Sequence, residues 1–269
     1  MRLGLMAKHD DRLRVAVAQD IMRFLAGRAD VVVKDELAPH FPDLPHGPLR
    51  DMKVDALITV GGDGTILYAL QQCDAPVFGV NTGELGFLTE VEPADLEVAL
   101  DALLGKKYAI EERLKLSVHI NGERLPDAAN EAVIKSAHPS KMLALRLSSN
   151  GEIIEDIRAD GVIMATPTGS TSYSMSAGGP IVDPRIEALI MVPLAAFKLG
   201  ARPFVFPARA KVEVRLPTNA KDAVLVLDGQ YERRLAGGDE VFFTGSEARA
   251  RFIRFSTHFY GRLRERLVR

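Results

Sequence analysis

The first third of the chain combines two kinds of hydrophobic pattern. Apolar residues stand at every fourth position from Leu13 to Leu25, which predicts a helix with one buried face. The segment 56–60 is instead a continuous apolar run, typical of a strand that helices cover on both faces. Because such strands and helices alternate, residues 1–105 are predicted to form an α/β domain with a parallel, Rossmann-like sheet.

The hydrophobic period changes near Gly105 to Glu111. Apolar residues from Leu114 to Ile120 alternate with polar or basic ones, which predicts a β-strand. Asn121-Gly122 follows, and this pair is a strong hairpin signal because both residues tolerate positive φ. The same combination recurs at 143–151. Residues 106–250 are therefore predicted to form a second, β-rich and sandwich-like domain.

The segment 251–269 returns to helical spacing from His258 onward. We expect this C-terminal helix to pack back on the N-terminal domain. A run of charged residues is usually a solvated helix face. Four arginines are expected on that face: Arg262, Arg264, Arg266 and Arg269.

Composition narrows the classes of protein that fit. The formal net charge is -2, so bulk electrostatics favours neither nucleic acid nor an anionic membrane as partner. The single cysteine, Cys73, excludes a disulfide within the chain, and we expect it to be a buried structural thiol. The sequence contains neither a signal-peptide core nor an apolar run of about 20 residues, so we expect a cytoplasmic protein without a membrane span.

The first candidate site is the glycine-rich stretch Gly61, Gly62, Asp63, Gly64 and Thr65. It follows a predicted buried strand and precedes a predicted helix, where open α/β sheets bind ligands. Glycines let phosphate oxygens reach backbone N–H groups, and the helix adds its dipole. Asp63 is the only carboxylate there, suited to act as a base on a hydroxyl or to orient a metal. An ordinary tight turn is the alternative, but three glycines around one acid favour function.

Two further polar stretches follow predicted strands. Asn81 to Leu88 comes after the next strand, and its residues either shape a turn or complete a site with the first loop; both interpretations stay open. The stretch Asp160 to Pro180 is rich in hydroxyls and glycines. Its part 166–176 is predicted to be a pocket-lining loop for a nucleotide, with Tyr173 offering a stacking face for a base. A Walker loop, a His-Glu-x-x-His site and a Cys-x-x-Cys pair are absent from the sequence.

These blocks together resemble the NAD kinase family. The resemblance spans roughly residues 56 to 230. Diacylglycerol-kinase-like lipid kinases share the first block, so the later blocks favour NAD kinase. The matching residues are Gly61 to Thr65, Asn81-Thr82-Gly83 with Leu85 to Leu88, Asn130-Glu131, Asp160-Gly161, Thr168 to Tyr173, Gly178 to Pro180 and Asp228-Gly229. One segment departs from the family: Val192 to Phe197 stands where many members have a segment containing Pro-His.

The resemblance implies an α/β domain (1–105) that binds nucleotide and a β-rich domain (106–250) that binds NAD, with the active site between them. It implies NAD and ATP as substrates, Mg²⁺ or another divalent metal bound with ATP, NADP as product, and a homodimer or homotetramer. Asp63 would be the catalytic acid nearest the reacting 2′-hydroxyl. Residues at the NAD site would be Asp63, Gly64, Asn130, Glu131, Asp160, Thr168, Thr171, Ser172, Tyr173 and Asp228. Residues at the ATP phosphates would be Gly61, Gly62, Gly64, Thr65, Asn81 and Gly83.

Within that set, Asn130 and Glu131 would hold the adenosine ribose, the 168–173 block would surround the adenine, and Asp160 would lie near the nicotinamide. Two other functions fit parts of the sequence. A lipid kinase shares the glycine block, but it predicts a greasy or basic docking surface. A non-catalytic NAD- or NADP-binding protein would keep the adenine block but does not need Asp63.

Overall fold

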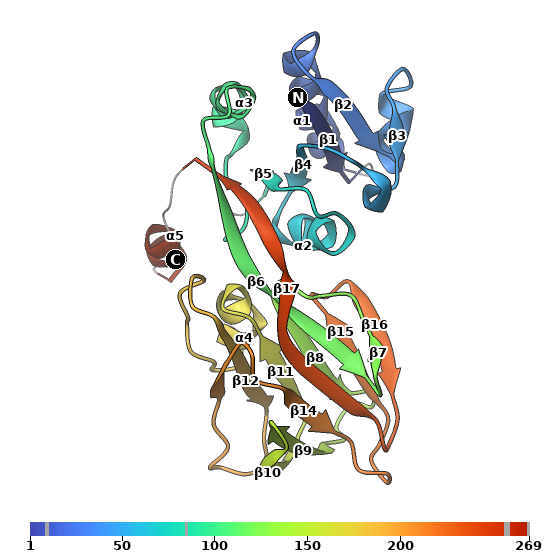
Figure 1. Ribbon diagram of the computed structural model, residues 1–269, viewed down its shortest axis with the longest axis vertical. Helices are drawn as coiled ribbons and strands as arrows, with labels where there is room; N and C mark the ends of the chain where they lie inside the picture. Colours follow the sequence, from blue (N-terminus) through green and yellow to red (C-terminus); the bar gives the residue numbers. More distant parts are fainter. Residues whose placement is uncertain (9–10, 84–85, 256–258, 268–269) are drawn as a thin grey trace. The chain divides into compact units, whose positions relative to one another are not determined.

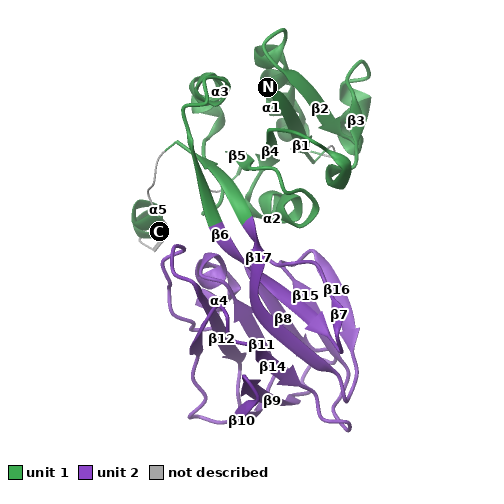
Figure 2. Ribbon diagram, in the orientation of Figure 1, with its two compact units in different colours: residues 1–112, 250–269 green, residues 113–249 purple. Residues whose placement is uncertain are grey.

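The computed structural model describes residues 1–8, 11–83, 86–255 and 259–267. The chain forms two compact units, which Figure 2 shows in different colours. Unit 1 comprises residues 1–112 and 250–269, and unit 2 comprises residues 113–249. The chain passes from one unit to the other within two long strands, β6 (Ala109–Ile120) and β17 (Glu240–Arg254).

Unit 1 contains a parallel sheet with the strand order β3-β2-β1-β4-β5. The C-terminal end of β17 pairs in parallel with β5 at Phe252 and Val77. The order reverses between β1 and β4, which makes the carboxyl end of β4 a topological switch point, where ligands bind in such sheets. The strands are β1 (Arg2–Ala7), β2 (Asp30–Lys34), β3 (His46–Gly47), β4 (Ala56–Gly61) and β5 (Val77–Asn81).

Helices cover both faces of this sheet (Figure 1). The core cluster on one face combines Ile58 and Phe78 with apolar residues of α1 and α3, and α2 packs on the other face, where Gly79 leaves room for Ile66. This explains the continuous apolar runs of β4 and β5. The helices are α1 (Arg12–Leu25), α2 (Asp63–Gln72), α3 (Leu96–Leu104) and α5 (Phe259–Leu267), with 3₁₀ turns η1 (Asp35–His40), η2 (Leu49–Asp51) and η3 (Pro93–Asp95).

Local signals account for several helix boundaries. Asp11 caps α1 by accepting hydrogen bonds from the amides of Leu13 and Arg14. The face predicted from Leu13 to Leu25 is buried except at Leu13 itself, which lies at its margin and is exposed. Cys73 follows α2 as its C-cap and is buried, and burial raises the pKa of its thiol. That environment suits a structural thiol.

Unit 2 consists of two sheets that share one hydrophobic core. The first has the order β10-β9-β14-β17, with β6 paired to β17 and to β7; the second is antiparallel throughout, with the order β13-β12-β11-β8-β15-β16. The remaining strands are β7 (Glu123–Arg124), β8 (Glu131–Ser136), β9 (Leu143–Ser149), β10 (Glu152–Ala159), β11 (Gly161–Ala165), β12 (Ala188–Leu194), β13 (Phe204–Pro207), β14 (Val212–Arg215), β15 (Ala223–Leu227) and β16 (Tyr231–Leu235).

Both predicted Asn-Gly turns are present. Asn121 and Gly122 join β6 to β7 and both have positive φ, and Asn150 and Gly151 do the same between β9 and β10. The stretch 166–176 differs from its prediction as a loop, because it forms η4 (Thr168–Thr171) and α4 (Tyr173–Ser176). Among the helices of the described residues, none is both long and apolar enough to cross a bilayer.

Candidate functional site

The glycine-rich stretch joins β4 to α2 in unit 1. Gly61 ends β4, Gly62 is the N-cap, and Asp63 is the first residue of α2. The helix predicted to follow this stretch therefore begins within it, and the amide of Thr65 bonds to the Gly62 carbonyl at 3.0 Å. Thr65 is buried while Gly64 is exposed. The first amides of a helix attract anions, so this corner is suited to phosphate.

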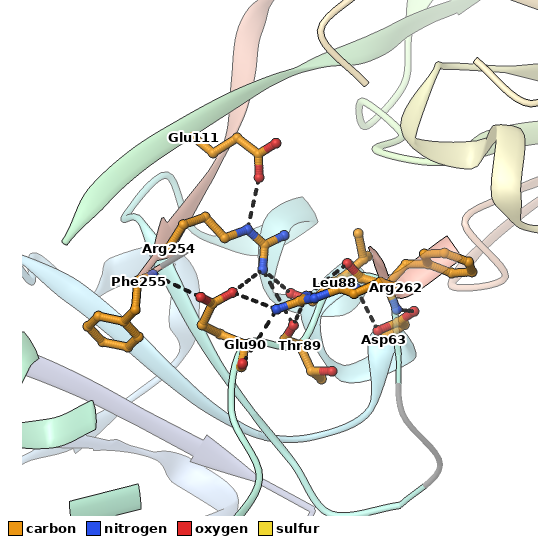
Figure 3. Close-up of polar contacts among 9 residues, drawn as sticks. Asp63, Leu88, Thr89, Glu90, Glu111, Arg254, Phe255 and Arg262 are labelled. Carbon is orange, nitrogen blue, oxygen red and sulfur yellow. Dashed lines mark hydrogen bonds and ion pairs between the residues drawn. The ribbon is translucent and has the colours of Figure 1, made fainter. Parts of the chain in front are cut away.

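The Asp63 carboxylate is held by two backbone amides (Figure 3). The amide of Phe87 donates to Asp63 Oδ2 at 2.8 Å, and the amide of Leu88 donates to Oδ1 at 3.0 Å. Gly86 precedes them, and a Cβ there would overlap the same carboxylate. The side chain is thus fixed in one orientation, as expected of a group that must meet a reacting atom.

The second glycine stretch of unit 1 lies beside the first. Asn81 ends β5 and pairs in register with Gly61, and the amide of Thr82 bonds to the Gly61 carbonyl at 3.3 Å. Asn81 Nδ2 donates to the Gly83 carbonyl at 3.0 Å, whereas its buried Oδ1 has no hydrogen-bond partner in the described structure. The structure therefore brings these two stretches together. Leu85, which belongs to the same motif, lies outside the described residues.

In unit 2, Asp228 organises the start of β8. Its carboxylate accepts hydrogen bonds from the amides of Ala129 at 2.7 Å, Asn130 at 2.8 Å and Glu131 at 3.0 Å. Asp228 itself stands in a turn with positive φ between β15 and β16. Its carboxylate is buried, and burial raises its pKa while the three amides lower it. Asp228 thus fixes the backbone that carries Asn130 and Glu131.

The hydroxyl-rich stretch is attached to the same backbone. Thr166 Oγ1 donates to the Ala129 carbonyl at 2.6 Å, and the Thr166 amide donates to the Asn130 carbonyl at 2.8 Å. Gly169 packs so closely on Asn130 that a Cβ would overlap the Asn130 carbonyl oxygen. These contacts place η4 directly beside the Asn130-Glu131 pair, although η4 follows that pair by more than thirty residues in the sequence.

Buried polar atoms in this cluster lack partners within the described residues: Asn130 Oδ1, Glu131 Oε2 and Thr168 Oγ1. Thr171 is buried too, and its hydroxyl bonds to the Thr168 carbonyl at 3.3 Å. Glu131 Oε1 accepts from the Ser172 hydroxyl at 3.3 Å. Burial, and then the nearby Asp228 carboxylate, raise the pKa of Glu131 to about 8. Unsatisfied buried oxygens are costly, so these atoms indicate a place for a polar ligand.

Two predicted site residues stand outside this set of contacts. Tyr173 begins α4 and is 48% exposed, which leaves its ring available for stacking. Asp160 is exposed and precedes β11, whose first residue Gly161 pairs with Lys135 and whose last residue Ala165 pairs with Glu131. Asp160 therefore lies at the opposite end of β11 from Glu131, and the structure does not join it to the cluster.

Sequence reasoning missed a group of buried charges in unit 1. Glu90 is buried between Arg254 of β17 and Arg262 of α5, so Arg262 is not on a solvated face as expected. Arg254 also pairs with Glu111 at 2.8 Å. The signal available was Arg254 itself, because an arginine next to Phe252 and Ile253 in a buried strand needs an acidic partner.

The side chains of the described residues do not form a metal-binding site of their own. Within those ranges no three His, Cys, Asp or Glu side chains come together in a way that would hold a metal ion. A corner that is suited to phosphate but offers a single carboxylate fits Mg²⁺ only where phosphates of a ligand and water supply most of its ligands.

Fold and site together define the class of two-unit proteins that join an α/β unit to a β-sandwich-like unit, with a glycine-rich corner suited to phosphate in unit 1 and a hydroxyl-rich cluster in unit 2. Two family models match the chain: the ATP-NAD kinase N-terminal domain over residues 44–108 and the ATP-NAD kinase C-terminal domain over residues 129–255. The chain is 45% identical to an NAD kinase of Methanothermobacter thermautotrophicus, over 100% of this chain and 96% of that protein. The chain belongs to the NAD kinase family.

Solved structures agree with this assignment. An NAD kinase from Archaeoglobus fulgidus, solved in complex with ATP, is 32% identical with a TM-score of 0.82 over 98% of this chain and 99% of that one. Yeast NADH kinase, solved with NADH, has a TM-score of 0.91 over 100% of this chain and 87% of that one. At 24% identity, this second likeness concerns the fold alone.

Proposed function

We propose that this protein transfers the terminal phosphate of ATP to the 2′-hydroxyl of the adenosine ribose of NAD, which gives NADP. The observation that carries the proposal is the placement of Asp63. It is the one acid of a glycine-rich corner at a topological switch point, and two amides hold both of its oxygens. Family membership supports the choice of NAD and ATP as substrates.

In unit 1 we assign binding of the ATP phosphates to the glycine corner. The backbone amides of Gly62 and Gly64, the α2 dipole and the neighbouring Thr65, Asn81 and Gly83 offer donors to phosphate oxygens. A divalent cation such as Mg²⁺, bound with ATP, would supply further charge neutralisation and would be held mainly by the ATP phosphates and water, which leaves the Asp63 carboxylate free to accept a proton.

Asp63 is assigned as the general base. A protonated ribose hydroxyl is a poor nucleophile, and phosphoryl transfer depends mainly on positioning and charge neutralisation. Asp63 would accept the hydroxyl proton as the ribose oxygen bonds to the γ-phosphorus and the bond to the β–γ bridging oxygen breaks, which releases ADP; such base catalysis is typically worth about 10²–10⁴ in rate. The amides of Phe87 and Leu88 keep the accepting oxygens in place, and within the described part of the chain no side chain bonds to these oxygens that would have to move away.

In unit 2 we assign binding of NAD. The unpartnered Asn130 Oδ1 and Glu131 Oε2 suit the adenosine ribose hydroxyls. With a pKa of about 8, Glu131 is largely protonated at neutral pH and can donate as well as accept a hydrogen bond. The segment that runs from Thr168 to Tyr173, with Thr171 and Ser172, would surround the adenine. Asp228 acts on NAD through the backbone that it holds, and Asp160 would serve the nicotinamide end.

The test is NADP formation by the purified protein with NAD, ATP and Mg²⁺. We expect NADP in proportion to enzyme and no phosphorylation of diacylglycerol. A folded protein that makes no NADP with varied metals and donors would contradict the proposal, and phosphorylated diacylglycerol instead would indicate a lipid kinase. NAD binding without turnover would indicate a binding protein. We also propose a homodimer or homotetramer, which the mass of the active species in solution tests.

The matched variant in this assay is Asp63→Asn. We expect turnover to fall by about 10²-fold or more, because the amide cannot accept the proton, while NAD affinity measured by calorimetry changes little. The Asn side chain has one accepting oxygen, whereas the two amides donate to two oxygens of Asp63, so the variant loses one hydrogen bond. Thermal unfolding is therefore measured in parallel to show that the variant is folded. An active variant would contradict the general-base role, and a parallel loss of NAD affinity would assign Asp63 to ligand positioning.

A further inference from the structure

The segment Phe87–Glu90 of unit 1 is bonded on two sides. The amides of Phe87 and Leu88 donate to the Asp63 carboxylate. The carbonyl groups of the same segment accept hydrogen bonds from two arginines that stand near the other end of the sequence, Arg254 and Arg262 (Figure 3). The segment thus connects the proposed catalytic acid with the C-terminal part of the chain.

Arg262 of α5 makes most of its contacts with this backbone. Its Nη1 donates to the Phe87 carbonyl at 3.4 Å and to the Thr89 carbonyl. Its Nη2 contacts the Glu90 carbonyl at 3.5 Å and the Glu90 carboxylate at 3.0 Å. The side chain is 18% exposed, so water competes little for these bonds. One planar guanidinium therefore bridges three carbonyls and one carboxylate.

The contact with Phe87 reaches Asp63 through a single peptide unit. The Phe87 carbonyl and the Leu88 amide belong to the same planar group, so fixing the carbonyl also fixes the direction of the N–H. That N–H is the donor to Asp63 Oδ1. A cation on the carbonyl also polarises the peptide group and strengthens its N–H as a donor. Arg254 instead bonds to the Leu88 carbonyl at 3.0 Å, in the next peptide unit.

We infer that Arg262 is a positioning residue for Asp63: it orients the Leu88 amide that holds the carboxylate. The inference rests on the proposed function, since Asp63 matters for turnover only if it serves as the base. The competing role for Arg262 is neutralisation of Glu90. Arg254 already provides that charge at 2.8 Å, and the Phe255 amide bonds to the other Glu90 oxygen at 2.8 Å.

The experiment compares Arg262→Gln and Arg262→Lys with Arg264→Gln. Arg264 stands on the same helix but is exposed, so the third variant removes the same charge without touching the segment. Steady-state kinetics gives kcat and KM for NAD and ATP, and NMR hydrogen exchange gives the protection of the Phe87 and Leu88 amides.

We expect Arg262→Gln to lower kcat about tenfold or more, with each KM within about twofold, because misplacement of a catalytic group acts mainly on the chemical step. The protection of the Leu88 amide should fall in the same variant. Lysine keeps the charge but not the bridging geometry, so Arg262→Lys should recover part of both losses. Arg264→Gln should match the unaltered protein.

The Asp63→Asn background separates positioning from general weakening of the fold. If Arg262 acts through Asp63, adding Arg262→Gln to Asp63→Asn lowers kcat by less than about twofold. The inference would be overturned if the losses in kcat from the two substitutions were fully additive in the double variant. It would also be overturned if Arg262→Gln lowered kcat without changing exchange at the Leu88 amide, or changed that exchange without lowering kcat. If Arg262→Gln does not fold, the lysine variant carries the same comparison.

Hydrogen exchange also separates this inference from the proposed function. If the unaltered protein makes no NADP but Arg262→Gln still lowers the protection of the Leu88 amide, the contact between Arg262 and this amide is upheld and only the proposed function is contradicted. Unchanged protection in that variant overturns the coupling whatever the activity of the unaltered protein.

Discussion

At the residue scale, Gly86 decides whether Asp63 can take its observed orientation. A Cβ at Gly86 would overlap the Asp63 carboxylate, which the following two amides hold in place. We expect Gly86→Ala to displace the carboxylate and lower turnover by about tenfold to 10²-fold, with smaller changes in the KM for NAD. Gly47→Ala is the control, since nothing lies within 4 Å of a Cβ there. Equal kcat in both variants would show that the carboxylate accommodates the methyl group.

Glu131 provides a prediction on pH at the same scale. Its pKa is about 8 in the folded protein against 4.5 for the free group, because the carboxyl is buried beside Asp228. Between these values the folded state binds more protons than the unfolded state. The contribution of Glu131 to stability is therefore fully present below about 4.5 and declines as pH rises toward 8. Each pKa unit corresponds to about 1.4 kcal/mol, so a loss of a few kcal/mol is expected across this window.

Glu131→Gln removes this titration while keeping size and polarity. We expect the Tm of the variant, relative to the unaltered protein, to increase by about 4 °C or more between pH 5 and pH 8, since 1 kcal/mol shifts the Tm of a chain of this size by about 2–4 °C. Glu232→Gln, at an exposed position of β16, should show no such trend in thermal scans at the same pH values. A Tm difference that stays constant with pH would mean that Glu131 titrates as in the unfolded chain.

At the element scale, the hydrophobic period predicted two kinds of element. One kind buries a single face against the core, and the other is buried on both faces. Strands such as β4 and β9 and the helix α1 are of these kinds, because burial alone selects their patterns. The stretch 166–176 was predicted as a loop, because clustered hydroxyls and glycines are typical of loops. Instead Ser170 Oγ bonds back to the Pro167 carbonyl at 2.7 Å, and contacts with Asn130 stabilise η4.

The unpredicted parts of the site depend on partners that are distant in the sequence. The glycine corner and the hydroxyl-rich stretch could be found from local motifs. The role of Asp228 as a backbone clamp could not, because its three donors lie 97 to 99 residues away. The solvated face expected for α5 was wrong at Arg262 for the same reason, since Glu90 lies 172 residues earlier. No local pattern contains such a pairing.

At the scale of the whole molecule, the two units differ in how the chain builds them. Unit 2 is continuous, and its core cluster contains only residues between Leu114 and Phe243. Unit 1 is assembled from two distant segments. Its core includes Ile253, and its buried Glu90 depends on arginines of the second segment. The division into an N-terminal and a β-rich domain is thus open to a direct test of independent folding.

We expect residues 113–249 to fold alone, with a β-rich circular dichroism spectrum and a cooperative thermal transition. Residues 1–112 alone should not, because this fragment lacks Ile253 of the unit 1 core, the strand that pairs with β5 and both arginines that pair with Glu90. Such losses are large against the few kcal/mol by which a domain of this size is stable. Joining 1–112 to 250–269 through about six glycine and serine residues should restore cooperative unfolding, since β6 pairs with β17 and the Glu111 carboxylate and Arg254 guanidinium form an ion pair at 2.8 Å. Cooperative unfolding of residues 1–112 without the second segment would show that β17 and α5 contribute no essential part of unit 1.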